Sequence, residues 1–137
     1  METLQWESIE KIAPTCFELV NDGGVVDTVR VTTRGTYQVN VSVTHAHSKR
    51  LSVVIACGQS GEETVIWPTF VQCMATKRFT SRIDRLVAFN VNDCLCVRLE
   101  HGDIPRSEEH RSNWAGKFAP ANNLLMLTYV DKNMLYV

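Results

Sequence analysis

Two histidines and two cysteines are spaced so that they could bind a metal ion. His45 and His47 are two positions apart, and so are Cys94 and Cys96. Because side chains alternate across a β-strand, the members of each pair point the same way if the segment is extended. Imidazole and thiolate are zinc ligands, so the two pairs could form a tetrahedral site where their strands meet. The alternative is a polar strand end beside two buried thiols, because structural zinc sites usually have tighter Cys-x₂-Cys spacing. We predict no metal.

The chain has five cysteines and four histidines, which raises the question of thiol catalysis. A nucleophilic thiol needs a neighbouring base that a third group orients. No segment has the pattern of a strand-to-helix nucleophile turn, and we predict no helix whose dipole would lower a thiol pKa. The glycine-containing segment Gly58–Glu63 lacks the lysine and the following helix of a phosphate loop. We therefore predict that the protein is not an enzyme and takes no cofactor.

Charge and cysteine content also limit the partners. A formal net charge of −1 gives no reason to expect nucleic acid, and no apolar run is long enough to span a membrane. An odd number of cysteines without a signal-peptide pattern favours reduced thiols in the cytoplasm. Secretion is the alternative, if a signal peptide lies upstream of Met1. We predict a protein as the partner.

A local basic cluster consists of Lys77, Arg78, Arg82 and Arg85. The simpler interpretation is a solvated loop. The alternative is a contact with an acidic partner, because clustered cations attract carboxylates.

The clearest structural signal is the segment from Gly35 to Val43. Its apolar and polar residues alternate, which predicts a strand with one apolar and one polar face. The apolar residues are Tyr37, Val39, Val41 and Val43, and the polar ones are Thr36, Gln38, Asn40 and Ser42. Such a strand needs a β-partner on each side and a second apolar layer.

Other β-rich segments follow at the 8–12-residue spacing that is typical of sandwiches and barrels. Leu51–Ala56 is apolar on both faces, which predicts a strand buried on both sides. Pro68 predicts a break or an edge strand. Asn92-Asp93 separates two β-rich segments, which predicts a two-residue hairpin with Asn92 in the left-handed conformation. Leu124–Val130 predicts a late buried strand.

The order and spacing of these elements resemble a known family. Gly35 and Tyr37 match its Gly-x-Tyr strand, residues 86–103 resemble its paired strands, and Trp114 and Gly116 match its closing aromatic-x-Gly. The chain therefore resembles the globular head of complement component q, in the tumour-necrosis-factor-like jelly-roll superfamily. The resemblance implies an all-β jelly-roll β-sandwich of two antiparallel sheets. It also implies a homotrimer around a threefold axis.

We expect residues 1–15 to form a short N-terminal extension and residues 16–137 to form a single jelly-roll domain. The expected function is a non-enzymatic protein-binding module that self-associates as a homotrimer. The alternative is a monomeric partner- or substrate-recruiting domain of a larger intracellular adaptor protein. The residues that we expect at the oligomer or partner surface are Gln38, Asn40, Ser42, Cys94, Cys96, Arg98 and Trp114.

Overall fold

Two antiparallel sheets make up the computed structural model of the chain, which describes residues 2–6, 16–22, 25–46, 48–74, 78–101 and 123–133. Sheet one consists of β1 (Glu2–Thr3), β2 (Phe17–Asp22), β3 (Val25–Val31), β5 (Lys49–Ala56), β6 (Glu63–Ile66) and β9 (Cys94–His101). Sheet two consists of β4 (Gly35–Ala46), β7 (Phe70–Met74), β8 (Arg78–Phe89) and β10 (Leu124–Asp131). The all-β prediction is confirmed, and the described residues contain no helix long and apolar enough to span a membrane.

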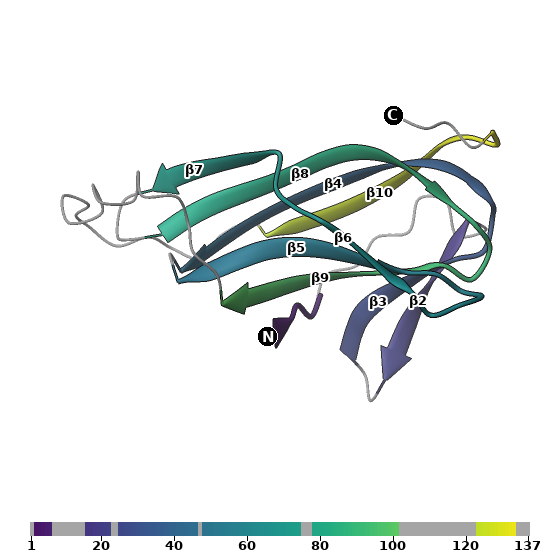
Figure 1. The fold of residues 1–137 in the computed structure, drawn as a ribbon, viewed down its shortest axis with the longest axis horizontal. Coiled ribbons are helices and arrows are strands. Elements are labelled where there is room, and N and C mark those ends of the chain that lie inside the picture. Colours follow the sequence, from purple (N-terminus) through teal and green to yellow (C-terminus); the bar gives the residue numbers. More distant parts are fainter. Residues whose placement is uncertain are drawn as a thin grey trace.

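The strand order is β2-β3-β9-β5-β6 in sheet one, where β1 also pairs with β9, and β10-β4-β8-β7 in sheet two (Figure 1). The chain crosses between the sheets from β3 to β4 to β5, from β6 to β7, and from β8 to β9 to β10. These repeated crossings give the sandwich a jelly-roll path. Pro68 lies in the crossing from β6 to β7, as its effect on a strand predicts.

Strand β4 is the centre of the core. Its inward side chains are buried, as the alternating pattern predicts, and they are Tyr37, Val39, Val41 and Val43. The Tyr37 ring lies edge-on to Phe89 and to Tyr129, with centroid distances of 5.4 and 5.3 Å. A Cβ on Gly35 would lie 2.4 Å from the carbonyl oxygen of Asp131, so the neighbouring β10 requires glycine at the start of β4.

Strand β5 is buried on both faces, which confirms its prediction. Leu51 and Val53 point into the core. Ser52 and Val54 point the other way, yet they are only 1% and 3% exposed. Side chains of sheet one therefore cover the outer face of this central strand.

The predicted hairpin at Asn92-Asp93 is wrong. Strand β8 pairs with β4 and β7 in sheet two, whereas β9 pairs with β3 and β5 in sheet one. The apolar faces of β8 and β9 face each other across the core instead of lying side by side in one sheet. The turn is an arch between the sheets, and Asn92 has the expected left-handed conformation, with φ of 74°.

Asp93 holds this arch in place from a buried position. Its carboxylate accepts hydrogen bonds from the backbone N–H of Asn90 at 2.8 Å and of Gly58 at 2.9 Å. The N–H of Asn92 donates to the Val31 carbonyl at 2.8 Å, which ties the arch to the end of β3. A buried carboxylate with two N–H donors is well satisfied, so Asp93 fixes the crossing.

Three residues of the basic cluster, Arg78, Arg82 and Arg85, lie on β8, so the loop interpretation is wrong for them. Lys77 lies outside the described residues. The side chains that alternate with the first two arginines point inward and are buried, and they are Phe79, Ser81 and Ile83. This period of two makes the segment a strand despite its charges.

Strand β10 confirms the predicted late strand but not its burial. Leu124, Met126 and Val130 are exposed, whereas Leu125 and Leu127 pack against the core. The reason is position, because β4 is the one strand that pairs with β10 in the described part of the chain. An edge strand over a single core buries only one of its faces.

Candidate interaction surfaces

The outward face of sheet two, here called the open face, has a polar stripe along its centre. Gln38, Asn40 and Ser42 lie on β4, and each is half-buried. The Asn40 side-chain amide donates to the Asp84 carboxylate on the neighbouring β8 at 2.6 Å. This bond gives the middle of the stripe a partner within the sheet.

Beside the polar stripe runs a row of apolar side chains, here called the apolar strip. It consists of Leu124, Met126 and Val130 on β10, which are 49%, 44% and 49% exposed. Leu124 lies opposite Ser42, and Met126 lies opposite Asn40. The open face thus combines half-buried polar groups with large exposed apolar groups.

The other predicted surface residues lie on the opposite side of the molecule. Cys94, Cys96 and Arg98 point outward from β9 in sheet one, because Leu95 and Val97 between them point into the core. This side is here called the covered face. The stripe on β4 and these three residues are therefore separated by the sandwich and do not form one surface. Trp114 lies outside the described residues.

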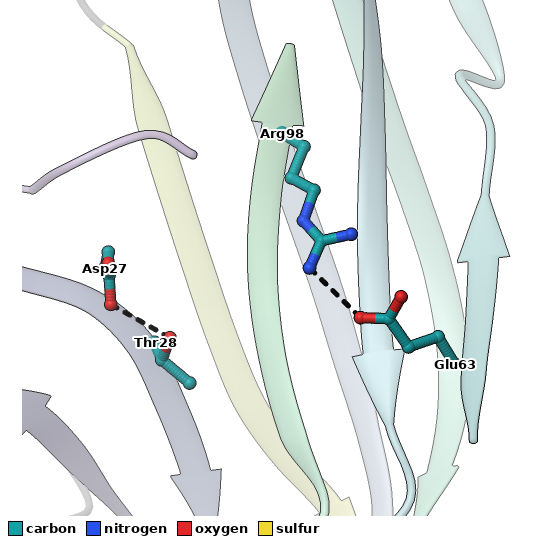
Figure 2. Close-up of polar contacts among 4 residues, drawn as sticks. All are labelled: Asp27, Thr28, Glu63 and Arg98. Atoms are coloured by element: carbon teal, nitrogen blue, oxygen red, sulfur yellow. Dashed lines mark hydrogen bonds and ion pairs between the residues drawn. The ribbon is translucent and has the colours of Figure 1, made fainter. Parts of the chain in front are cut away.

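Two contacts between long side chains lie over the covered face. The Arg98 guanidinium crosses from β9 over β5 to the Glu63 carboxylate on β6, with an N–O distance of 3.0 Å (Figure 2). The Arg50 guanidinium carbon lies 3.7 Å from the centroid of the Trp67 ring. Arg98 and Glu63 come from the strands on the two sides of β5, and their contact over this strand is consistent with the burial of Ser52 and Val54.

A second polar contact lies on β3, at the side of this face. The Thr28 hydroxyl donates to the Asp27 carboxylate at 2.9 Å (Figure 2). Thr28 is the register partner of Cys96. Sequence reasoning missed Glu63, because its partner Arg98 comes from a strand that is distant in the chain. It also missed Asp27, which bonds to its own neighbour in the chain.

The thiols of the described residues differ in their surroundings. Cys16, Cys57, Cys94 and Cys96 are free and half-buried, so the expectation of two buried thiols is wrong for Cys94 and Cys96. Burial raises the pKa of the Cys96 thiol, and the Arg98 guanidinium partly opposes this effect. Burial also raises the pKa of Cys94. Hydrogen bonds from the backbone and hydroxyl of Ser60, and from the backbone of Gln59, lower the pKa of Cys57 at the exposed turn after β5.

His45 lies in the core and makes two hydrogen bonds. Its Nδ1 is 2.8 Å from the carbonyl oxygen of Ala46, which can only accept, so Nδ1 carries the proton. Its Nε2 then accepts from the Ser81 hydroxyl at 2.6 Å. Burial lowers the pKa of His45, and the charge of Arg78 adds to this effect, while the Ala46 carbonyl opposes it.

The position of His45 in the core bears on two chemical roles, a nucleophile–base pair and a zinc site. Ser81 and His45 are in contact as in a nucleophile–base pair, but they are 1% and 2% exposed, so no substrate reaches them. The zinc hypothesis fails for His45, which points into the core, whereas Cys94 and Cys96 point away from it on the other sheet. His47 lies outside the described residues, among which no cluster of three metal-binding side chains occurs.

Large exposed apolar side chains occur on several described strands. They include Leu124, Met126 and Val130 on β10, Phe70 and Val71 on β7, and Val65 on β6, whereas the contacting pair His45–Ser81 is buried. No protein-family model matches the chain, and no curated protein matches it.

Proposed function

We propose that the protein is a non-enzymatic binding module that self-associates through its open face, as a homotrimer. The observation that carries this proposal is the apolar strip of Leu124, Met126 and Val130 along an edge strand. Soluble monomers protect long edge strands with charges or proline, and the segment Leu124–Val130 contains neither. A second copy that covers the strip would remove this apolar surface from water.

The polar stripe is compatible with burial at such an interface. Buried polar groups need hydrogen-bond partners, and the Asn40 amide already has one in Asp84. Thr44 is the next outward residue of β4, and its hydroxyl lies 2.9 Å from the hydroxyl of Thr80 on β8. Gln38 and Ser42 are the residues that we expect to bond across the interface. The internal bonds lower the desolvation cost that a polar interface otherwise has.

The choice of three copies rests on the resemblance to the tumour-necrosis-factor-like heads. The jelly-roll path of the strands is in keeping with that resemblance. In a closed threefold ring every copy of the interface is occupied. A heterologous contact that does not close into a ring would instead build a filament. The partner-binding surfaces of the module then lie outside the threefold contact.

Sedimentation velocity and light scattering of the purified protein, on the order of tens of micromolar, test the proposal. The expected species has three times the chain mass of 15.5 kDa. Met126→Glu should convert it to a folded monomer, because it places a charge in the centre of the apolar strip. Val65→Glu is the matched control, because Val65 is also exposed but lies on the covered face.

Two results would overturn the proposal. One is a wild-type protein that stays monomeric over this concentration range, which would favour the monomeric recruiting domain. The other is equal dissociation by Met126→Glu and Val65→Glu, which would place the contact elsewhere. Circular dichroism of both variants verifies that each remains folded.

A further inference from the structure

Strand β8 is longer than the strand that covers its outer edge. Strand β4 pairs with β8 along its whole length, from Arg78 to Phe89. On the other side β7 pairs only with residues 78–82, and β8 continues beyond the start of β7 (Figure 1). In the described parts of the chain, no strand pairs with this edge of β8 after Arg82. A row of backbone N–H and C=O groups there is a template for another strand.

The side chains along this edge are only partly covered. Asp84 and Arg85 are exposed, and the next three residues, Leu86, Val87 and Ala88, are half-buried. Val87 packs against the hydrophobic core from its position on the edge. A further strand beside β8 would complete the burial of Val87 on one face and of Leu86 on the other.

The charge of this edge is positive. Arg82 and Arg85 are exposed, and no ion pair connects either of them to a carboxylate in the described part of the structure. Asp84 is the nearest acidic residue in the strand, but its carboxylate accepts the Asn40 amide on the β4 side. Arg82 and Arg85 lie on opposite faces of the strand, because Arg82 is the register partner of the outward Ser42 and Arg85 is that of the inward Val39. The Arg85 guanidinium thus shares a face with Val87 and remains available for a carboxylate of a partner that approaches along the edge.

We infer that the edge of β8 from Asp84 to Ala88 binds an extended segment of a partner protein, in which an acidic residue and an apolar residue lie two positions apart on the same face. The backbone of that segment adds a strand to sheet two. Its carboxylate binds Arg85, and the apolar side chain two positions away on the same face covers Val87. Strand addition divides recognition in this way, because backbone bonds supply affinity and alternate side chains supply specificity.

This site is separate from the proposed self-association surface. The strand order β10-β4-β8-β7 places the apolar strip of β10 and the β7 side of β8 on opposite sides of β4. The two proposals can therefore fail independently. Met126→Glu should leave peptide binding intact, and a change at Arg85 should leave the oligomeric state intact.

The test uses the full chain, labelled with ¹⁵N, and a blocked ten-residue peptide in which glutamate and valine take turns at every second position, with threonine between them, so that both lie on one face. The expected result is shifts of the backbone amide signals of residues 84–88, with a Kd on the order of 0.1 mM. A peptide with lysine in place of glutamate should bind about three- to tenfold more weakly, because its ammonium groups meet Arg85. Two further peptides, N-methylated on either set of alternate amides, test the backbone pairing, and one of them should not bind.

Arg85→Ser should weaken the glutamate peptide by about three- to tenfold and leave the lysine peptide unaffected or slightly tighter. Arg30→Ser is the matched control, because Arg30 is an exposed arginine on β3 in sheet one, and it should change neither affinity.

Three results would overturn the inference. The first is equal binding of the glutamate and lysine peptides, or binding of neither at millimolar concentration. The second is slow hydrogen exchange of all the amides of residues 84–88 in the free protein, which would mean that another part of the chain already pairs with the edge. The third is a change in oligomeric state in Arg85→Ser, which would assign the edge to contacts between copies.

Discussion

The two outward faces of the sandwich differ in how far their apolar side chains are exposed. On the covered face, Val54 points outward from the central strand β5 and is 3% exposed, because side chains of neighbouring strands reach over it. On the open face, Val130 points outward from the edge strand β10 and is 49% exposed. The same residue type is buried in one sheet and exposed in the other, although both side chains point away from the core.

The difference follows from position within the sheet. Strand β5 has neighbours on both sides, and Arg98 and Glu63 extend over it from two different strands. Long side chains of this kind bury apolar surface beneath their stems while their charged ends stay in water. Strand β10 has a single described neighbour, β4, whose outward side chains are short and polar. A partner molecule is needed to cover β10, whereas β5 is covered from within.

Val54 and Val65 test the largest consequence of this difference. They are register partners on the covered face, but Val65 lies on the edge strand β6 and is 42% exposed. Val54→Ala should lower the free energy of unfolding by about 2 kcal/mol, because it removes two buried methyl groups and leaves a cavity. Val65→Ala should change it by less than about 0.5 kcal/mol. Urea unfolding at one fixed protein concentration measures both values.

Equal costs for the two variants would break the comparison. They would mean that the side chains over Val54 do not exclude water, and that the covered face is as open as the other one. The fixed concentration matters because self-association adds to apparent stability.

The thiols extend the comparison from packing to reactivity. Cys96 lies on the covered face, where burial raises its pKa, whereas hydrogen bonds at the turn after β5 lower the pKa of Cys57. The thiolate is the reactive form, so Cys57 should react with a disulfide reagent at pH 7.5 about tenfold faster than Cys96. Cys57→Ser should remove the fast phase of labelling, and Cys96→Ser should retain it. A fast phase that survives in Cys57→Ser would assign the reactive thiol to another position.

His45, near the end of β4, should make the free energy of unfolding depend on pH. The arginines of the covered face cannot add such a dependence, because arginine stays protonated. Burial lowers the pKa of His45 in the folded protein, whereas an unfolded histidine titrates near 6.5. Below pH 6.5 the unfolded chain therefore binds the proton first, and the free energy of unfolding falls until the pH has passed the lower pKa of the folded state. One such proton contributes at most about 1.4 kcal/mol per pH unit, and above pH 6.5 its effect vanishes.

His45→Phe serves as the comparison variant in urea unfolding between pH 5 and pH 8. Its absolute stability is not the readout, because the change also removes the hydrogen bond from Ser81. The readout is the slope, which should be smaller than that of the wild type below pH 6.5. An unchanged slope would assign the acid sensitivity to other groups.

Local sequence patterns were sufficient to predict those features of the fold that depend on one strand or one turn alone. The alternation from Gly35 to Val43 predicted both faces of β4, and the apolar run from Leu51 predicted the burial of β5. The left-handed conformation of Asn92 also followed from residue type.

Features that depend on pairing could not be predicted in the same way. The pattern around Asn92 is the same for a hairpin and for an arch, because both need a tight turn between two strands with one apolar face. The burial of β10 depends on what lies beyond its edge, and apolar composition alone predicted it wrongly. The separation of Asn40 from Cys96 on opposite faces depends on which sheet each strand joins.

The contact between Arg98 and Glu63 should have the smallest effect on stability. It tests whether the ion pair itself or the side-chain stems above Val54 keep the covered face closed. Both side chains are partly exposed, at 22% and 47%, and such ion pairs contribute less than about 1 kcal/mol. Glu63→Gln should therefore change the free energy of unfolding in urea only slightly. The control variant Glu62→Gln, at the exposed neighbouring position, should also change it only slightly. Only Glu63→Gln should speed the labelling of Cys96, because the Glu63 charge contributes to its raised pKa. A loss of 2 kcal/mol or more in Glu63→Gln alone would mean that the ion pair itself, and not the side-chain stems above Val54, holds the covered face closed.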